Sequence, residues 1–434
     1  MAICMKKLKI LKTLTKNEIF SKNDNFWEGL SKKAYPLTKG KLRIPISVEP
    51  FSVTADEFLK LEDNLQLLIS AAKKLSSAYF DNELLQNLIS VNPEEKQLIN
   101  ESRKEDFIGI IRVDLFYGKS PKIVEINADF PDGFFMHDIT PREICKWFIK
   151  EKDKYRIFDH AKLFNELLES LVIDKNSHIF IGYDKARKFI DEFALNKMKL
   201  EKDGWKNVSM GAFEDLEFIN EKLYFDKRPI DVIRRGAELF KLRKIPGLMK
   251  KLVSEQQKGR IKIINNFKMR LLGHKALMAV LWDKRFRRYL NKNEIKAIKL
   301  LLPETLKLKA VDIPRLLDEK DLWVLKPSDL AEGESIYIGS VLTNKKWNKA
   351  VRLALKKSSN WIVQKKVDIP EEKFNLIDNE NRKTIQVKRK FDFNPHVILL
   401  KKNCKLGWII NRYSELEVLN VMKGGGLTYT FVEK

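Results

Sequence analysis

Two alternating runs of residues, on either side of Gly118, carry the side chains with the clearest chemical potential. The first reads I-I-R-V-D-L-F, so a strand there would place Arg112 and Asp114 on one face. The second reads K-I-V-E-I-N-A and would place Glu125 and Asn127 together in the same way. Two carboxylates and an amide oxygen are hard ligands that suit Mg²⁺, which takes its other ligands from water and substrate phosphates.

The linker between the runs, Tyr117–Pro121, is short enough to make them a β-hairpin. We expect strands at 109–116 and 122–128, with all four polar side chains on one patch. Arg112 would then help to neutralise a transferred phosphoryl group. Alternation alone also fits a cross-strand ion pair between Arg112 and Glu125, which would add only about a few tenths of a kcal/mol to stability. Both interpretations stay open on this pattern.

The composition is globular but strongly basic. The 434 residues are 44% hydrophobic and 33% charged, and 83 Lys and Arg against 59 Asp and Glu give a net charge of +24. This length allows two or three domains, and the charge favours anionic partners such as phosphates, acidic substrates or nucleic acid. Within the basic stretch 241–299, Trp282–Tyr289 interleaves aromatic residues with arginine, as surfaces that bind single-stranded nucleic acid do. A solvated helix face explains the same run, and we expect no stable nucleic-acid partner.

The cysteines and the apolar runs bear on the cellular compartment. Cys4, Cys145 and Cys404 are far apart and odd in number, so we expect neither a disulfide framework nor a zinc site, and a cytoplasmic location. Lysines interrupt the apolar residues of 1–16, which leaves no continuous apolar segment for a secretory signal. No apolar run approaches the roughly 18 residues of a membrane span.

Capping residues and apolar spacing predict the elements that must position the hairpin. Thr54–Glu57 is a capping box, and apolar residues at three- and four-residue steps behind it predict a helix of about six turns. His178–Tyr183 is a buried type of strand that we expect to run into a helix at 184–193, within a small Rossmann-like α/β unit. The further predicted elements are an extended segment at 41–53; helices near 93–104 and at 140–172; strands at 206–210, 222–225 and 230–234; a helix at 272–281; strands at 322–326 and 335–339; a helix at 345–357; and strands at 361–367 and from 388 onward.

The hairpin pattern resembles the metal-binding strand pair of ATP-grasp enzymes: R-x-D, about ten residues, then E-x-N, with Pro131 and Gly133 behind it. In most of that superfamily these strands lie near the C-terminus. Their early position here is similar to the circularly permuted members, including the synthetase domain of glutathionylspermidine synthases. The resemblance implies an α/β (α+β) fold, namely a circularly permuted ATP-grasp with a small Rossmann-like pre-ATP-grasp unit.

The permuted order predicts that the nucleotide-binding lysines come later in the chain, and similar segments do follow. Ile264–Leu281 resembles the segment in which Lys275 would be the first phosphate lysine. Trp323–Pro327 resembles the strand that supplies the second, Lys326, and a compact cation on a long stem suits both positions. Asn360–Pro370 resembles the hinge strand that holds adenine. The residues that this match implies around the base are Gln364, Lys365 and Val367.

Two more segments complete the resemblance. Asn394, Arg412 and Asn420 match the closing strands of the fold, and Pro229–Glu238 resembles the pre-grasp segment, with Arg234 on the substrate side. By the same resemblance the remaining roles are catalysis for Arg112 and Arg412, and metal binding for Asp114, Glu125 and Asn127.

The resemblance covers about 41–434 and predicts two lobes around the nucleotide. One lobe bears the lysines, and the other bears the carboxylates and combines the early hairpin with the last strands. The predicted parts are a variable lead-in at 1–40; a helical segment with the metal-binding hairpin at 41–172; the pre-ATP-grasp unit at 173–262; the nucleotide-clamping lobe at 263–384; and the closing strands at 385–434.

An enzyme of this kind would bind Mg-ATP, convert a carboxylate to an acyl phosphate and let an amine attack it, releasing ADP and phosphate. The substrates would be a small-molecule or peptide carboxylate and an amine. One departure from the family lies after Lys326, where Glu332 and Glu334 replace small residues of a phosphate-covering loop and would repel a triphosphate. A degenerate nucleotide-binding scaffold and a basic nucleic-acid-binding protein therefore remain as alternatives.

Overall fold

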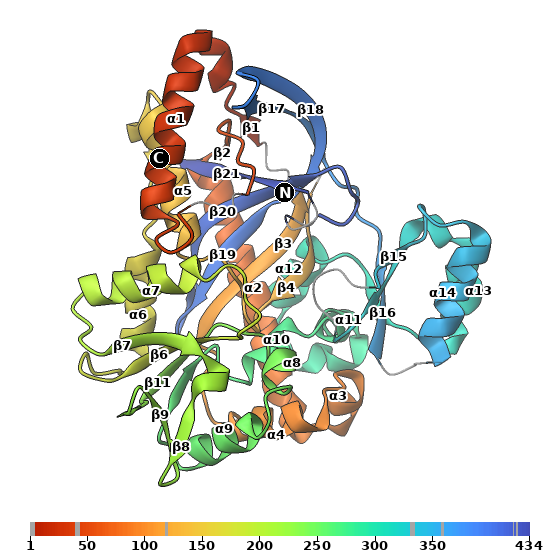
Figure 1. The fold of residues 1–434 in the computed structure, drawn as a ribbon. Helices are drawn as coiled ribbons and strands as arrows, with labels where there is room; N and C mark the ends of the chain where they lie inside the picture. Colours follow the sequence, from red (N-terminus) through yellow and green to blue (C-terminus); the bar gives the residue numbers. More distant parts are fainter. Residues whose placement is uncertain are drawn as a thin grey trace.

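A computed structural model describes residues 5–39, 44–117, 120–329, 335–356, 360–419, 421 and 424–434. In this part of the chain a mixed sheet of ten strands runs through the centre of the molecule, with helices around it (Figure 1). Its main path has the order β1-β2-β21-β20-β19-β3-β4. The strands are β1 (Lys6–Lys7), β2 (Phe51–Val53), β3 (Gly109–Tyr117), β4 (Pro121–Asn127), β5 (Tyr155–Arg156), β17 (Glu371–Asp378), β18 (Lys383–Phe391), β19 (Asn394–Leu399), β20 (Cys404–Ser414) and β21 (Gly426–Glu433).

The predicted hairpin forms one end of this sheet. β3 pairs antiparallel with β4 on one side and with β19 on the other. β19, β20 and β21 continue as an antiparallel meander. The early hairpin and the last strands are therefore neighbours in one sheet, which is the arrangement that the permuted order predicts.

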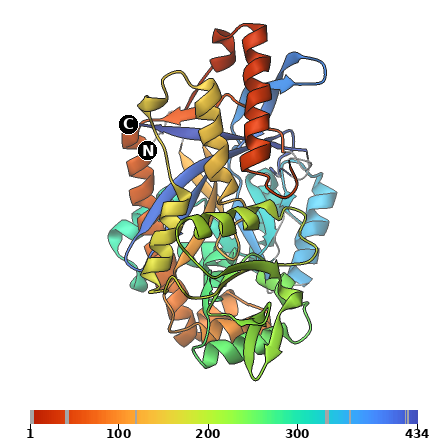
Figure 2. The ribbon, with the colours of Figure 1, turned by 60° about the vertical axis from the view of Figure 1, so that its left-hand side comes forward.

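Helices cover the sheet, and the longest follows its predicted pattern. The side chain of Thr54 accepts a hydrogen bond from the N–H of Glu57, and α2 (Ala55–Ala78) follows this capping box. Its apolar residues at three- and four-residue steps are buried against the sheet and against α12 (Lys292–Leu301). The predicted lead-in contains α1 (Lys16–Lys33), which packs on α5 (Met136–Phe148) (Figure 2). Phe26 of α1 is fully buried, so this helix is part of the core.

The middle of the chain forms the expected small α/β unit. Its parallel sheet has the order β12-β11-β6-β7, and the strands at 178–183, 206–210 and 230–234 are confirmed within two residues at each end. A three-stranded ribbon, β10-β9-β8, lies beside it. The strands of the unit are β6 (Ile179–Tyr183), β7 (Val208–Ala212), β8 (Glu217–Ile219), β9 (Lys222–Phe225), β10 (Arg228–Pro229), β11 (Val232–Arg235) and β12 (Lys262–Ile264).

Two predicted helices have different limits in the structure. The helix expected at 184–193 is wrong: the chain first turns, with the N–H of Arg187 on the carbonyl of Asp184, and α7 begins only at Asp191. The continuous helix expected at 140–172 is also wrong, because β5 interrupts it to pair with β21. Asp159 then caps a second helix, α6 (His160–Ser170). Pairing with a strand almost 300 residues away overrides local helix propensity here.

A small lobe projects from the main body beside the hairpin and carries its own core of Trp323, Trp347 and Trp361 (Figure 1). Its antiparallel sheet has the order β13-β16-β14-β15. The helix at 345–357 is confirmed within the described residues, and so are the three predicted strands: the first is shifted by one residue, and the other two are shorter than predicted. The elements of the lobe are β13 (Thr305–Lys307), α13 (Ile313–Asp318), β14 (Trp323–Pro327), β15 (Tyr337–Ile338), α14 (Asn344–Lys356) and β16 (Trp361–Lys365).

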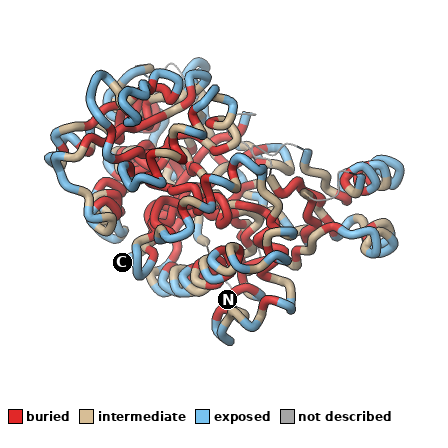
Figure 3. Tube along the Cα trace, turned by 90° about the horizontal axis from the view of Figure 1, so that it is seen from below, coloured by how far each residue is buried: buried red, intermediate tan, exposed pale blue. Residues whose placement is uncertain are grey.

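The buried part of the chain follows the central strands, and the outer turns of the peripheral helices are exposed (Figure 3). In the ranges that the structure describes, no helix combines the length and apolarity needed to cross a bilayer. The remaining helices are α3 (Glu83–Leu88), α4 (Pro93–Glu101), α7 (Asp191–Lys202), α8 (Leu239–Leu242), α9 (Leu248–Gln257), α10 (Met269–Gly273) and α11 (Ala276–Trp282).

Candidate nucleotide site

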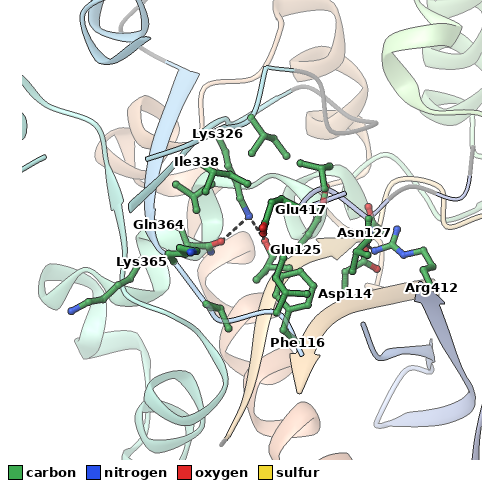
Figure 4. Close-up of a pocket in the computed structure, with 18 of the residues that line it drawn as sticks. Asp114, Phe116, Glu125, Asn127, Lys326, Ile338, Gln364, Lys365, Arg412 and Glu417 are labelled. Carbon is green, nitrogen blue, oxygen red and sulfur yellow. Dashed lines mark hydrogen bonds and ion pairs between the residues drawn. The ribbon is translucent and has the colours of Figure 1, made fainter. Parts of the chain in front are cut away.

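A pocket of about 210 Å³ lies between the hairpin and the small lobe (Figure 4). The hairpin carboxylates form one wall, and Lys326 and Gln364 form the opposite wall. Of the residues predicted for catalysis, nucleotide binding and metal binding, all except Lys275 line it. The lining residues are Arg112, Asp114, Phe116, Val124, Glu125, Asn127, Val324, Lys326, Ile336, Ile338, Gln364, Lys365, Lys366, Val367, Ile369, Arg412, Glu417, Val418 and Leu419.

The register of the hairpin brings its four polar residues onto one face. Asp114 lies opposite Glu125, and Arg112 lies opposite Asn127, with a β-bulge directly after Asp114. The ion pairs of these residues are not the cross-strand pair between Arg112 and Glu125. Arg112 Nε lies 2.8 Å from Asp114 Oδ1 on its own strand, and Glu125 Oε1 lies 2.8 Å from Lys275 Nζ. Glu125 therefore faces a cation from a distant segment of the chain.

Asp114 is the centre of a buried charge network. Arg412 on β20 donates from Nη2 to Asp114 Oδ2 at 2.9 Å, and its Nε donates to Asp392 Oδ2 at 2.7 Å. Burial works against the charged form of Asp114, but Arg112 and Arg412 outweigh it and lower the pKa of this carboxyl to about 2. Asp114 is therefore an anion at neutral pH, held by two guanidinium groups.

Lys326 supplies a buried ammonium on the opposite wall. Its Nζ donates to Gln364 Oε1 at 2.8 Å and to the carbonyl of Val124 at 3.1 Å. Gln364 Nε2 donates in turn to Thr305 Oγ1 at 3.1 Å, which fixes the amide with its oxygen toward the lysine. Burial lowers the pKa of Lys326 to about 8, with Glu125 acting in the opposite direction. The ammonium is thus charged at neutral pH but close to its titration range.

Lys275 reaches the site through Glu125. The helix predicted at 272–281 is interrupted at His274 and Lys275, so that α10 ends before them and α11 begins after them. The N–H of Lys275 donates to the carbonyl of Ser328 at 3.2 Å, which joins this break to the strand of Lys326. His274 is buried and its Nε2 lies 3.2 Å from the carbonyl of Ser90, as expected for a structural histidine.

The hinge strand presents side chains to the pocket, but two of its amides are already satisfied. The N–H of Lys365 donates to the carbonyl of Glu304, and the N–H of Lys366 donates to the carbonyl of Leu322, both at 2.7 Å. A base at this wall would therefore contact other groups of the strand. The apolar residues of this segment that line the pocket are Val367 and Ile369.

Several lining residues were not predicted from the sequence. Phe116 on β3 and Ile338 on β15 give the pocket apolar sides, and alternation along their strands could have indicated them. Glu417, Val418 and Leu419 come from the segment after β20, where no pattern predicts a role. Glu417 Oε1 is paired with Lys390 Nζ at 2.5 Å.

The loop after Lys326, which departs from the family pattern, is described in part. Glu332 and Glu334, with the repulsion predicted for them, lie outside the described residues, as does Asn420. Gly339 at the end of β15 is described, and a Cβ there would come within 1.8 Å of the carbonyl oxygen of Lys320. This glycine is therefore required for close packing of two backbones.

A second cavity, of about 220 Å³, adjoins the first and shares Arg112 and Arg412 with it. Glu192 lines it and is buried, accepting hydrogen bonds from the N–H groups of Phe135 and Met136 at the start of α5. Burial raises the pKa of Glu192 to about 7. The lining of the cavity thus combines the guanidinium groups of Arg112 and Arg412 with the carboxyl groups of Asp132 and Glu192.

Two other residues near this cavity are buried and have partners within the protein. Arg234, predicted on the substrate side, is buried on β11, donates to the carbonyl of Arg235 at 2.6 Å and lies over the ring of Phe130. Among the described lining residues of both cavities, Arg234 is absent. His137 does line the second cavity, and burial lowers its pKa to about 3, so it is neutral and bonded to the Tyr429 hydroxyl.

Comparisons with known proteins place this geometry in context. A family model of the glutathionylspermidine synthase pre-ATP-grasp domain matches residues 48–379. No curated protein gives a significant match. Among solved structures, the apo form of a glutathione synthetase-like effector from Globodera pallida has 10% sequence identity and a TM-score of 0.67, over 96% of this chain and 98% of that chain.

Two further structures are more distant. A putative gamma-glutamylcysteine synthetase from Methylobacillus flagellatus KT has 13% identity and a TM-score of 0.44, over 81% of this chain and 84% of that chain. D-alanyl-alanine synthetase A from Vibrio cholerae O1 biovar eltor has 11% identity and a TM-score of 0.30, over 60% of this chain and 89% of that chain.

Proposed function

Because the chain belongs to the glutathionylspermidine synthase pre-ATP-grasp family and has the α/β, circularly permuted ATP-grasp fold predicted from its sequence, we propose that it is an ATP-dependent ligase that joins a carboxylate to an amine. The observation that carries the proposal is the pocket between hairpin and lobe. It opposes the buried carboxylate of Asp114 and the half-buried carboxylate of Glu125 to the buried ammonium of Lys326, with apolar side chains beside them. That arrangement suits a nucleotide whose phosphates need cations and whose base needs apolar contact.

The ammonium groups of Lys326 and Lys275 would bind the phosphates. Lys326 is held by Gln364 and Val124, so it needs little reorganisation to meet an anion. Lys275 is tied to Glu125, whose carboxylate would turn from the lysine toward a metal when nucleotide enters. Phe116 and Ile338 would flank the base.

The donor set of the hairpin fits a magnesium ion. Asp114, Glu125 and Asn127 supply two carboxylates and an amide on one face, and Mg²⁺ takes only one or two carboxylates when phosphates complete its shell. Among the described residues, Asn127 Nδ2 is buried without a hydrogen-bond acceptor, so no protein acceptor holds this amide in place. These three side chains would hold the ion, which would supply positive charge to neutralise the charge that develops on the phosphates. Arg112 and Arg412 would hold Asp114 in position and face the transferred group.

The reaction would proceed in two displacements. An oxygen of the substrate carboxylate attacks the γ-phosphorus, the bond to the β–γ bridging oxygen breaks, and ADP leaves. The amine then attacks the carbonyl carbon of the acyl phosphate, inorganic phosphate leaves, and the amine proton passes to solvent. The second cavity would hold these substrates, since it meets the first at Arg112 and Arg412. The protein contributes positioning and charge neutralisation and forms no covalent bond to substrate.

Nucleotide product analysis over a panel of acids and amines tests this proposal. We expect ADP and phosphate, and hydroxylamine in place of the amine should trap the acyl phosphate as a hydroxamate. Formation of AMP and pyrophosphate would exclude the mechanism. Nucleotide binding without product across a broad panel would instead support the degenerate scaffold.

Mg-ATP should stabilise the folded protein. A ligand present at a hundred times its Kd adds about 2.7 kcal/mol to the free energy of unfolding, which moves the melting temperature by a few degrees. GTP should shift it less, because the hinge is expected to select adenine. Thermal melts with and without Mg²⁺ measure this, and the absence of a shift with any adenine nucleotide would contradict the proposal.

The affinity for ATP should fall above pH 8. Burial depresses the pKa of Lys326 to about 8, so its ammonium is present below that pH and is lost as the pH rises. The Kd for ATP should be level from pH 6.5 to 7.5 and then rise toward tenfold per pH unit. Calorimetric titration from pH 6.5 to 9.5 measures it. Lys326→Met should bind weakly with no such rise, and a level Kd in the wild type would show that this lysine does not contact the nucleotide.

A further inference from the structure

A third cavity, of about 470 Å³, lies at the joint between the main body and the small lobe, and it shares no residue with the nucleotide pocket. Its walls come from α11, from the turn that follows α11 and from β13. The turn belongs to Trp282–Tyr289, the basic aromatic segment that the proposed ligase leaves without a role. The cavity therefore requires an explanation of its own.

The charges around this cavity are mostly positive after the internal pairs are formed. Asp283 accepts from the guanidinium of Arg285 at 2.5 to 3.0 Å. Glu304 lies 3.6 Å from Arg315 and 3.9 Å from Lys365, which are outside the cavity lining. The third carboxylate of the lining, Asp312, accepts a hydrogen bond from the backbone N–H of Lys309 and so caps the turn at 309–312. The cations left to face a ligand are Lys284, Arg287, Lys307 and Lys309.

Two of the lining residues carry buried donors without acceptors. Within the described ranges, Lys307 Nζ and Trp282 Nε1 are buried and have no hydrogen-bond partner. A buried ammonium without an acceptor is costly, and such groups in a folded protein call for a specific cause. Burial lowers the pKa of Lys307 to about 8, so it still carries its charge at neutral pH. An anion with several acceptor oxygens would satisfy both donors.

We propose that this cavity is a second anion site, which binds a small ligand carrying a phosphate group with more than one negative charge. Several N–H donors from two separate elements, the segment around Trp282 and β13, match the oxygens of a phosphate better than the two oxygens of a carboxylate. The cations surround a cavity between two elements rather than following an open stripe, so a compact ligand fits better than a nucleic-acid strand. β13 also pairs with β16, with Lys307 opposite Ile362, so the ligand would lie beside the hinge strand of the nucleotide site.

Inorganic pyrophosphate, titrated calorimetrically without Mg²⁺, is the probe. The wild type should bind one equivalent, and Lys307→Met and Arg287→Gln should each weaken binding at least tenfold. Lys296→Met is the matched control, because Lys296 is exposed on α12 and outside the cavity lining. That control and Lys326→Met, which removes the nucleotide lysine, should bind within twofold of the wild type. Thermal melts check that each variant is folded. If one of the two cavity variants does not fold, the affinity of the other for pyrophosphate provides the test.

Three results would overturn the site. Binding lost in Lys326→Met and kept in Lys307→Met would put pyrophosphate in the nucleotide pocket. Equal affinity for pyrophosphate in all variants, or no binding of pyrophosphate at millimolar concentration, would show that these cations are ordinary solvated side chains. The third result is binding of a short single-stranded RNA that Arg287→Gln weakens and with which pyrophosphate does not compete. That result would show that the ligand of this surface is a nucleic acid and not a small phosphate compound. None of these results depends on ligase activity, so the site and the proposed function can fail separately.

Discussion

Lys326→Met should lower kcat for ATP-dependent ligation by about 10²- to 10³-fold, the loss typical when one preorganised cation or donor at a developing charge is removed. Lys326 is 8% exposed, so its charge would act on the phosphates of a bound nucleotide with little screening by water. Methionine keeps an unbranched apolar chain out to the ε position and lacks only the terminal nitrogen, so the main change is the loss of the ammonium. Steady-state release of ADP, with the acid and amine found in the substrate panel, measures the effect.

The control for this variant must separate charge from packing. Lys326→Met removes a buried ammonium, so the free energy of unfolding without nucleotide should not fall by more than about 1 kcal/mol. In the Lys326→Met variant, the increase in melting temperature produced by Mg-ATP should also be smaller than in the wild type. Full ligase activity in a folded Lys326→Met protein would exclude Lys326 from phosphate binding.

Glu125→Gln should reduce turnover by at least about 10²-fold and raise the Mg²⁺ concentration that half-saturates ATP consumption. The amide is isosteric, so packing is preserved, but it lacks the negative charge that a hard cation requires. Glu417→Gln is the matched control. Glu417 lines the same pocket but is paired with Lys390 and has no predicted metal role, so its loss should leave the Mg²⁺ dependence unchanged.

The alternative for Glu125 gives a different result. If its only role were the ion pair with Lys275, the variant would lose no more than about 1 kcal/mol of stability and would consume ATP with the same Mg²⁺ dependence. Equal titration curves for Glu125→Gln and the wild type would therefore remove Glu125 from the metal ligands.

Local patterns of the sequence correctly predicted the elements that carry the candidate site. The alternation around Asp114 and Glu125 predicted two strands and the face that they share, because side chains alternate by two in any strand. Thr54 and Glu57 marked the start of α2, since a capping box satisfies its own backbone groups. The order of the lysine segments came from the family resemblance, and no local pattern would have distinguished Lys326 from the other lysines.

Only the tertiary structure decided which groups meet across long separations in the chain. Arg412 and Asp114 are almost 300 residues apart, and Lys275 and Glu125 are 150 apart, so no periodicity relates them. The pairing of β5 with β21 likewise divided a segment whose composition favours one helix. The cavities around Glu192 and Lys307 formed where separate elements pack together, because buried charges take whatever partners the packing brings within reach.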